Sequence, residues 1–141
     1  GVNVKHIEIE LTESSLQSSE SDVLEKLLAL KALGINIAID DFGTGYSSLS
    51  RLKNFPIDLL KIDRSFVLDI CHNKSDLAII KAIINMSTAL DINTLAEGIE
   101  NENQANVLNM LSCQYGQGFL FSKAINGKQF QLLLSESPAD N

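Results

Sequence analysis

Short apolar runs alternate along this chain with longer segments whose apolar residues recur every three or four positions. The short runs are rich in Ile and Leu and span about five residues each, which is typical of β-strands. They predict strands over residues 7–11, 36–40, 59–63, 93–97 and 115–119. The longer segments have the period of an amphipathic α-helix. They predict helices over residues 21–33, 46–54, 75–90, 101–111 and 126–134.

Three of the predicted helices carry end signals in the sequence. Gly34 follows the helix over 21–33, and glycine is common just past a helix end because it adopts a left-handed backbone without a Cβ clash. Asn101 with Gln104, and Asn126 with Gln129, have the spacing of a capping box. In that motif each side chain accepts a hydrogen bond from the backbone N–H of the other residue. These signals support the predicted boundaries.

The alternation of strand and helix along the whole chain favours a parallel sheet with helices packed outside it. Parallel strands joined by single helices form either a doubly wound sheet or a barrel. The chain contains neither the Gly-x-Gly-x-x-Gly fingerprint nor the P-loop pattern. A doubly wound nucleotide-binding fold therefore has no direct support.

Length and charge narrow the function classes. The chain has 141 residues, enough for one domain, and its net charge of −7 argues against binding a nucleic-acid polymer, which requires a basic face. No apolar run is long enough to span a membrane, and no signal peptide opens the chain. Cys71 and Cys113 lie far apart, so we expect neither a zinc site nor a disulfide but a reduced, cytoplasmic protein. His6 and His72 are isolated and are expected in surface or packing positions.

Asp40 and Asp41 stand together at the end of the strand predicted over 36–40, directly before the turn sequence Phe-Gly-Thr-Gly-Tyr. Two adjacent carboxylates repel each other unless a positive charge lies between them. Mg²⁺ and other hard cations bind carboxylate oxygens, so a metal site is one interpretation. The other is an ordinary aspartate turn or helix N-cap, which is common before glycine. This stretch alone favours neither.

On one face of each predicted strand, the last side chain is polar. Because side chains alternate between the two faces of a strand, that face can be followed to the strand's end. The residues at these ends are Glu10, Asp40, Lys61, Glu97 and Gln117. Active sites of parallel barrels lie at the C-terminal strand ends. Acidic residues recur at several strand ends, with one lysine among them. This repetition favours metal or phosphate chemistry over a set of solvated residues at the start of loops.

Longer stretches of the sequence resemble the EAL domain, a bacterial phosphodiesterase family that hydrolyses cyclic di-GMP. The matching stretches follow the order of the family and run through nearly the whole chain. They are Glu10-Leu-Thr-Glu13, Asp40-Asp-Phe-Gly-Thr-Gly-Tyr-Ser-Ser-Leu49, Lys61-Ile-Asp-Arg-Ser-Phe66, Ala96-Glu-Gly-Ile-Glu100 and Gln117-Gly-Phe-Leu-Phe-Ser-Lys123. The long block that starts at Asp40 is highly specific, whereas Lys-Ile-Asp alone is weak. Ala124 stands where the family usually has Pro.

The resemblance implies catalytic roles for several positions. Glu10 and Asp40 are similar to the ligands of one metal ion. Asp40, Asp41 and Glu97 are similar to the ligands of a second. Glu97 is also the implied general base, and Lys61 is the implied group that orients the attacking water. The implied cofactor is a two-metal site that holds Mg²⁺ or Mn²⁺.

Further roles follow from the same resemblance. Gln117 is similar to a residue that contacts the substrate. Glu13 is similar to the residue that holds the Asp-Phe-Gly-Thr-Gly loop in place. Gly43 and Gly45 allow that loop to adopt positive φ angles or to hinge. The loop is linked in the family to dimerisation and metal binding, so a homodimer is expected.

The resemblance also implies a fold of the α/β class, a (β/α) TIM-type barrel, and a reaction that opens cyclic di-GMP to linear pGpG. Such a barrel has eight βα units and typically about 250 residues, whereas about five units are predicted here. Residues 1–141 are therefore expected to be the C-terminal part of a single EAL phosphodiesterase domain, an incomplete barrel. The Glu-Ala-Leu motif and an Asn-bearing strand are expected upstream of Gly1. We thus expect little or no activity from the 141-residue chain alone.

Three functional hypotheses follow. The first is a cyclic di-GMP phosphodiesterase in the cytoplasm, or on the cytoplasmic side of a membrane-anchored parent, with regulatory domains upstream. The second is a catalytically inactive EAL-like module that binds cyclic di-GMP or a protein partner. The third is an unrelated α/β barrel with a structural acidic rim. The chain begins with Gly rather than Met and ends in a polar tail over 135–141, so we expect a segment cut from a longer chain that keeps its natural C-terminus.

Overall fold

A computed structural model describes residues 3–17, 19–44 and 49–136 of the chain. Its strands form one parallel sheet in the order in which they occur along the chain. They are β1 (Glu8–Thr12), β2 (Asn36–Phe42), β3 (Leu59–Ile62), β4 (Asn93–Ala96) and β5 (Tyr115–Gly116). Sequential parallel order with helical connections is the arrangement of a barrel wall, so the chain forms part of an α/β barrel.

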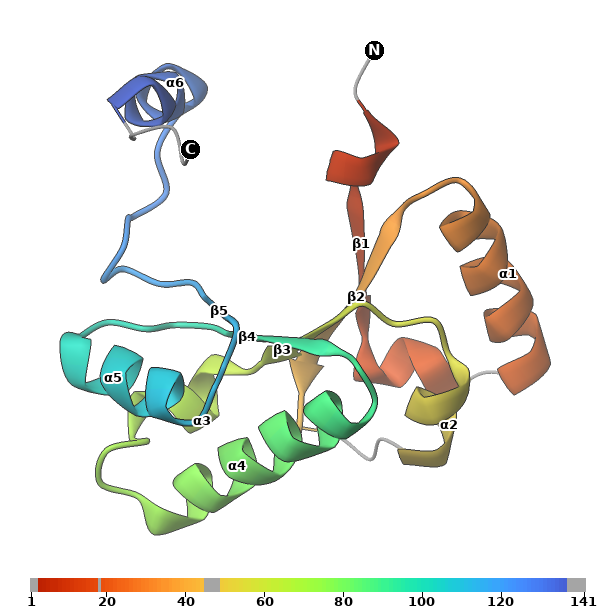
Figure 1. The fold of residues 1–141 in the computed structure, drawn as a ribbon, viewed down its shortest axis with the longest axis horizontal. Helices are drawn as coiled ribbons and strands as arrows, with labels where there is room; N and C mark the ends of the chain where they lie inside the picture. The colour runs from red at the N-terminus through yellow and green to blue at the C-terminus, as the bar shows by residue number, and fades with distance from the viewer. Residues whose placement is uncertain (1–2, 18, 45–48, 137–141) are drawn as a thin grey trace.

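Helices connect successive strands, and one further helix follows the last strand. They are α1 (Glu20–Ala32), α2 (Leu49–Asn54), α3 (Arg64–Leu68), α4 (Lys74–Ala89), α5 (Glu102–Met110) and α6 (Gly127–Glu136), with short 3₁₀ turns η1 (Val4–His6) and η2 (Glu13–Gln17). In Figure 1, α1, α2, α4 and α5 lie around the sheet, while α6 stands apart at the end of an extended segment. The described residues contain no helix long and apolar enough to cross a membrane.

The core lies between the central strands and their helices. Ile37, Ala38 and Ile39 of β2 are all fully buried, as are Leu60 and Ile62 of β3. Burial on both faces is expected for the central strands of a parallel sheet that is covered by helices. The side chains of β1 instead alternate between half-buried and exposed, which leaves one face of this strand open.

The predicted strands are confirmed, with small shifts at their ends, except for the last one. The strand predicted over 115–119 is wrong beyond residue 116. Gly118 turns the chain out of the sheet, and its backbone passes so close to Ile99 that a Cβ added at Gly118 would lie 2.1 Å from the Ile99 carbonyl oxygen. The Phe121 N–H then donates to the Gly118 carbonyl over 3.1 Å. This turn ends the strand and leaves Gln117 in a loop.

The predicted helices are confirmed with end shifts of one or two residues, apart from the one over 46–54. Residues 46–48 lie outside the described part of the chain, and α2 covers the remainder. The short helix α3 and both 3₁₀ turns were not predicted, because each is too short to show a period in the sequence. His6 and His72 are exposed, as expected. Cys71 is exposed and Cys113 half-buried, and both are free thiols.

The capping box predicted at the start of α5 is confirmed, and it makes a testable stability contribution. The Gln104 backbone N–H donates to Asn101 Oδ1 over 3.1 Å, and Gln104 Oε1 accepts from the Asn101 N–H over 3.2 Å. Loss of an N-cap typically costs about 1 kcal/mol. We therefore expect Asn101→Ala to lower the free energy of unfolding by ~1 kcal/mol in urea denaturation. Asn106→Ala, at an exposed position within the same helix, serves as the control and is expected to be slightly stabilising, because Ala has a higher helix propensity than Asn. Equal loss in both variants would contradict the assignment.

Candidate active site

Lys61 of β3 lies at the centre of the polar strand ends. Its side chain is almost fully buried, and its Nζ contacts carboxylates from three other strand ends. The distances are 2.7 Å to Glu10 Oε1, 2.8 Å to Glu97 Oε1 and 3.0 Å to Asp40 Oδ1. The parallel register of β1 to β4 brings these ends to one edge of the sheet. Four of the five residues predicted at the strand ends therefore converge on one point.

The three surrounding carboxylates stabilise the positive charge of Lys61. Burial alone lowers the pKa of a lysine, because it disfavours the charged form. At Lys61 the contacts with Glu10, Glu97 and Asp40 outweigh burial and raise the pKa above its ordinary value. The ammonium group is thus present at neutral pH and offsets part of the negative charge of the carboxylates.

Asp40 and Asp41 point to the same place although they are neighbours in a strand. The pairing of β2 with β3 shifts register between Ile39 and Phe42, and Asp41 has a φ of 53°. In a regular strand, consecutive side chains point to opposite faces. The irregular backbone instead brings carboxylate oxygens of Asp40, Asp41 and Glu97 within 4.8 Å of one another. This close grouping favours the metal interpretation of the Asp-Asp pair over the plain turn.

The donor set fits a divalent cation. Three carboxylates that converge within 4.8 Å offer oxygen ligands of the kind that Mg²⁺, Mn²⁺ and Ca²⁺ bind. Asp40 Oδ1 is buried and accepts no hydrogen bond within the described residues; its contact there is the ion pair with Lys61. The Lys61 ammonium compensates this oxygen in part, but one ammonium does not balance all the carboxylates grouped here, and a divalent cation would offset the remaining negative charge. Glu10 contacts the same Lys61 Nζ that Asp40 and Glu97 contact.

Asp63 contacts Asp41 of the carboxylate group, although the sequence pattern gave it no role. It is the N-cap of α3, and its carboxylate accepts from the backbone N–H of Ser65 over 3.0 Å. Burial raises the pKa of Asp63, but the hydrogen bonds from Ser65 outweigh burial and lower it. Desolvation, the charges of Asp40 and Asp63 and a hydrogen bond with Asp63 raise the pKa of Asp41, although its side chain is exposed. Asp directly before a helix is a preferred N-cap residue, and this preference is the sequence signal that could have marked the cap.

The loop after β2 is described as far as Thr44. Gly43 has a φ of 99°, and a Cβ there would lie 3.1 Å from the Phe66 ring, so this position requires glycine. Gly45 lies outside the described residues. Glu13 begins η2 and is buried, which places a carboxylate inside the protein directly after β1. Its role in holding the loop stays a prediction.

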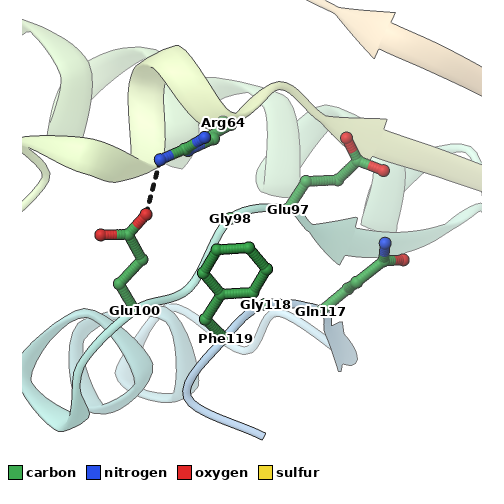
Figure 2. A pocket seen from close by; sticks show the side chains of 7 residues that line it. All are labelled: Arg64, Glu97, Gly98, Glu100, Gln117, Gly118 and Phe119. Carbon is green, nitrogen blue, oxygen red and sulfur yellow. Dashed lines mark hydrogen bonds and ion pairs between the residues drawn. The ribbon is translucent and has the colours of Figure 1, made fainter. Parts of the chain in front are cut away.

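A pocket lies beside Glu97, lined by residues from the start of α3 and from the loops that follow β4 and β5. The lining residues are Arg64, Glu97, Gly98, Glu100, Gln117, Gly118 and Phe119. Figure 2 shows Glu97 and Gln117 on one side, the Arg64–Glu100 ion pair on the other, and the Phe119 ring between them. Gln117 thus lies next to the carboxylate cluster, on a loop rather than on the predicted strand.

Five pocket residues had no predicted role: Gly98 and Gly118, which have no side chain, and three residues with large side chains. Arg64, Glu100 and Phe119 lie within the motifs that resemble the EAL family, but each looks like an ordinary surface residue in the sequence. The signal that could have found them is their spacing, since each follows a strand-end residue by two or three positions. Loops after parallel strands face the same rim as the strand ends.

Comparison with known proteins identifies the family. A family model of the EAL domain matches residues 1–124. The cyclic di-GMP phosphodiesterase NbdA of Pseudomonas aeruginosa is 41% identical over 125 residues, which cover 89% of this chain and 16% of NbdA. The crystal structure of the EAL domain of Mycobacterium smegmatis DcpA is 43% identical with a TM-score of 0.86, over 94% of this chain and 60% of that one. The chain belongs to the EAL domain family.

A further solved structure bears on metal binding. BlrP1 of Klebsiella pneumoniae, in complex with manganese and cyclic di-GMP, is 34% identical with a TM-score of 0.79. The match covers 86% of this chain and 31% of BlrP1. The same protein is also known in a calcium complex with cyclic di-GMP, so members of the family bind divalent metals. The chain spans between 16% and 22% of the length of the curated relatives it matches.

Proposed function

We propose that residues 1–141 form the C-terminal part of a single EAL domain, and that the full-length protein carrying it hydrolyses cyclic di-GMP to linear pGpG. The observation that carries this proposal is the convergence of Glu10, Asp40 and Glu97 on Lys61, with Asp41 beside them. Family membership and the activity named for NbdA support the same substrate. "Full-length protein" below means the natural chain that contains these residues.

The carboxylates are proposed to hold two divalent ions, Mg²⁺ or Mn²⁺. Glu10 and Asp40 are the proposed ligands of one ion, and Asp40, Asp41 and Glu97 those of the other. When bound, such ions neutralise the phosphate charge and make water a better nucleophile. The manganese complex of BlrP1 supports a divalent metal here.

The side chains of the chain have separate proposed tasks. Glu97 accepts the proton of the attacking water, because its carboxylate is half-buried at the centre of the site. Lys61 orients that water with its buried ammonium group. Gln117 contacts the substrate from the pocket beside Glu97. In the same pocket the flat Phe119 ring and the Glu100 carboxylate suit a planar base that carries N–H donors, as guanine does.

The direct test is hydrolysis by the purified full-length protein. Cyclic di-GMP is incubated with Mg²⁺, Mn²⁺ or EDTA, and products are separated by liquid chromatography, with cyclic di-AMP and cyclic GMP as alternative substrates. We expect pGpG to form from cyclic di-GMP with either metal and not with EDTA. Binding of cyclic di-GMP without hydrolysis would instead identify the catalytically inactive receptor. If the protein neither binds nor hydrolyses cyclic di-GMP, the remaining hypothesis is an α/β barrel with a structural acidic rim.

The 141-residue chain alone is expected to have little or no activity. In the part of the chain that is described, Glu10 and Asp40 are the carboxylates available to the first ion, fewer than such an ion needs. We expect its turnover with Mg²⁺ or Mn²⁺ to be at least about 100-fold below that of the full-length protein, since a metal-site ligand set is incomplete. Equal turnover in the same chromatographic assay would refute the two-ion arrangement.

We also propose a homodimer, a position in the cytoplasm or on the cytoplasmic side of a membrane-anchored parent, and regulatory domains upstream. The lengths of the curated relatives support additional domains, because the matched region is a minor part of each. Gel filtration with light scattering of the full-length protein tests the dimer.

A further inference from the structure

We propose that Arg64 is a positioning residue of the pocket: it braces the backbone over residues 97–100 and holds the Glu100 carboxylate where the base of the nucleotide binds. This inference rests on the proposed function, because it takes the pocket ligand to be a cyclic dinucleotide. It assigns to Arg64 an effect on affinity that acts through Glu100 and not through contact with the ligand.

The first observation is the ion pair at the pocket rim. Arg64 is the first residue of α3, directly after the N-cap Asp63, so the start of the helix fixes its backbone. Arg64 Nη2 lies 2.6 Å from Glu100 Oε1, and Figure 2 shows this contact along one side of the pocket. The two side chains are 54% and 40% exposed. An ion pair this exposed contributes little to folding, so its main effect is on where Glu100 lies.

The second observation is that the aliphatic part of the Arg64 side chain packs against Gly98. A Cβ at Gly98 would lie 2.2 Å from Arg64 Cγ and 2.7 Å from Cδ. The methylene groups of Arg64 therefore occupy the space that any other residue at position 98 would need. Gly98 also has a φ of 72°, a conformation that glycine adopts without strain.

The third observation is that the same segment is held from its other side. The Gly118 backbone passes against Ile99, and the Ile99 N–H donates to the Gln117 carbonyl over 3.0 Å. The Glu97 N–H donates to the Ile62 carbonyl over 3.1 Å, and the Glu100 N–H donates to Gln104 Oε1 over 2.8 Å. Residues 97–100 thus follow a fixed path between Arg64 and Gly118.

The consequence is a link between the two halves of the site. Glu97 at one end of the segment contacts Lys61, and Glu100 at the other end faces the pocket. The backbone of Glu100 is fixed, but its side chain is held by Arg64. Without the guanidinium this side chain gains rotamer freedom, and ordering it on binding costs affinity. The carboxylate of Glu97 keeps its contact with Lys61, so catalysis itself changes little.

A double-mutant cycle separates this role from direct contact with the ligand. The variants of the full-length protein are Arg64→Met, which keeps the stem and removes the charge, Glu100→Gln, and the double variant. KM and kcat are measured for cyclic di-GMP hydrolysis, with the dissociation constant from calorimetry. We expect R64M to raise KM and the dissociation constant roughly five-fold, the upper range for an exposed ion pair, and to leave kcat within about two-fold.

The double variant is expected to bind no more weakly than E100Q alone, because Arg64 acts through Glu100. Arg64→Lys keeps a positive charge and is expected to restore most of the affinity. Lys31→Met is the matched control. It breaks an ion pair at the opposite end of β3, where Lys31 Nζ lies 2.7 Å from Asp58 Oδ1, and it is expected to leave KM and kcat unchanged. Thermal unfolding of each variant confirms that it is folded.

The results distinguish failure of the inference from failure of the proposed function. If R64M weakens binding as much in the E100Q background as in the wild type, Arg64 contacts the ligand itself and the inference is wrong. A fall in kcat at constant KM, or an R64K variant as weak as R64M, also overturns it. If the wild type binds cyclic di-GMP without hydrolysing it, the dissociation constants of the four proteins in the cycle decide whether Arg64 acts through Glu100. If it neither binds nor hydrolyses cyclic di-GMP, the proposed function fails and the inference fails with it.

Discussion

Glu97→Gln in the full-length protein is expected to lower kcat for cyclic di-GMP by on the order of 10³-fold, the range for losing a general base. The carboxylate of Glu97 contacts Lys61 Nζ over 2.8 Å and groups with those of Asp40 and Asp41. A neutral amide of the same shape neither accepts a proton from water nor brings a full negative charge to a metal ion. Both losses act on the chemical step, so kcat is expected to change far more than KM.

Two measurements make this prediction decisive. Glu102→Gln, an exposed change of the same kind at the start of α5, serves as the matched control and should retain wild-type turnover. Circular dichroism should show that the Glu97 variant is folded. Hydrolysis within about ten-fold of wild type in that folded variant would exclude Glu97 as the base, since such a loss is below the range for general base catalysis.

Lys61→Met is expected to lower both stability and turnover. Lys61 is the cation that the structure places among Glu10, Asp40 and Glu97, and its removal leaves these carboxylates to repel one another. Removing one partner of a buried ion pair costs about 3–5 kcal/mol, and the partial exposure of the three carboxylates reduces this to about 2 kcal/mol. Turnover is expected to fall by about 10²-fold or more, as for other groups that act on the attacking water.

The metal dependence of the Lys61 variant tests the physical reason. In EDTA, thermal unfolding should show the full loss of stability. Added Mn²⁺ should raise the unfolding temperature of the variant more than that of the wild type, because a ligand that binds only the folded state stabilises it and the variant site is more negative. Lys81→Met, at an exposed position on α4, should behave as wild type in both conditions. Equal Mn²⁺ shifts in K61M and wild type would show that Lys61 does not face the metal site.

The order of strands and helices could be predicted from the sequence because their periods differ. Four strands and the long helices α1, α4 and α5 agree with the expected ranges, and both capping boxes form. The fifth strand was overestimated because Gln117, Gly118 and Phe119 have the alternation of a strand. The close passage of Gly118 against Ile99, far away in the sequence, ends the strand instead.

The pattern of the chain alone determined that acidic residues and Lys61 occupy the ends of parallel strands, because strand alternation and the position of the carboxyl ends are local properties. Tertiary structure decided which of these groups meet. The bulge in β2 turns Asp41 beside Asp40, and the turn after β5 places Gln117 and Phe119 opposite Arg64. Both depend on contacts between segments that are distant along the chain, and local residue preferences do not carry that information.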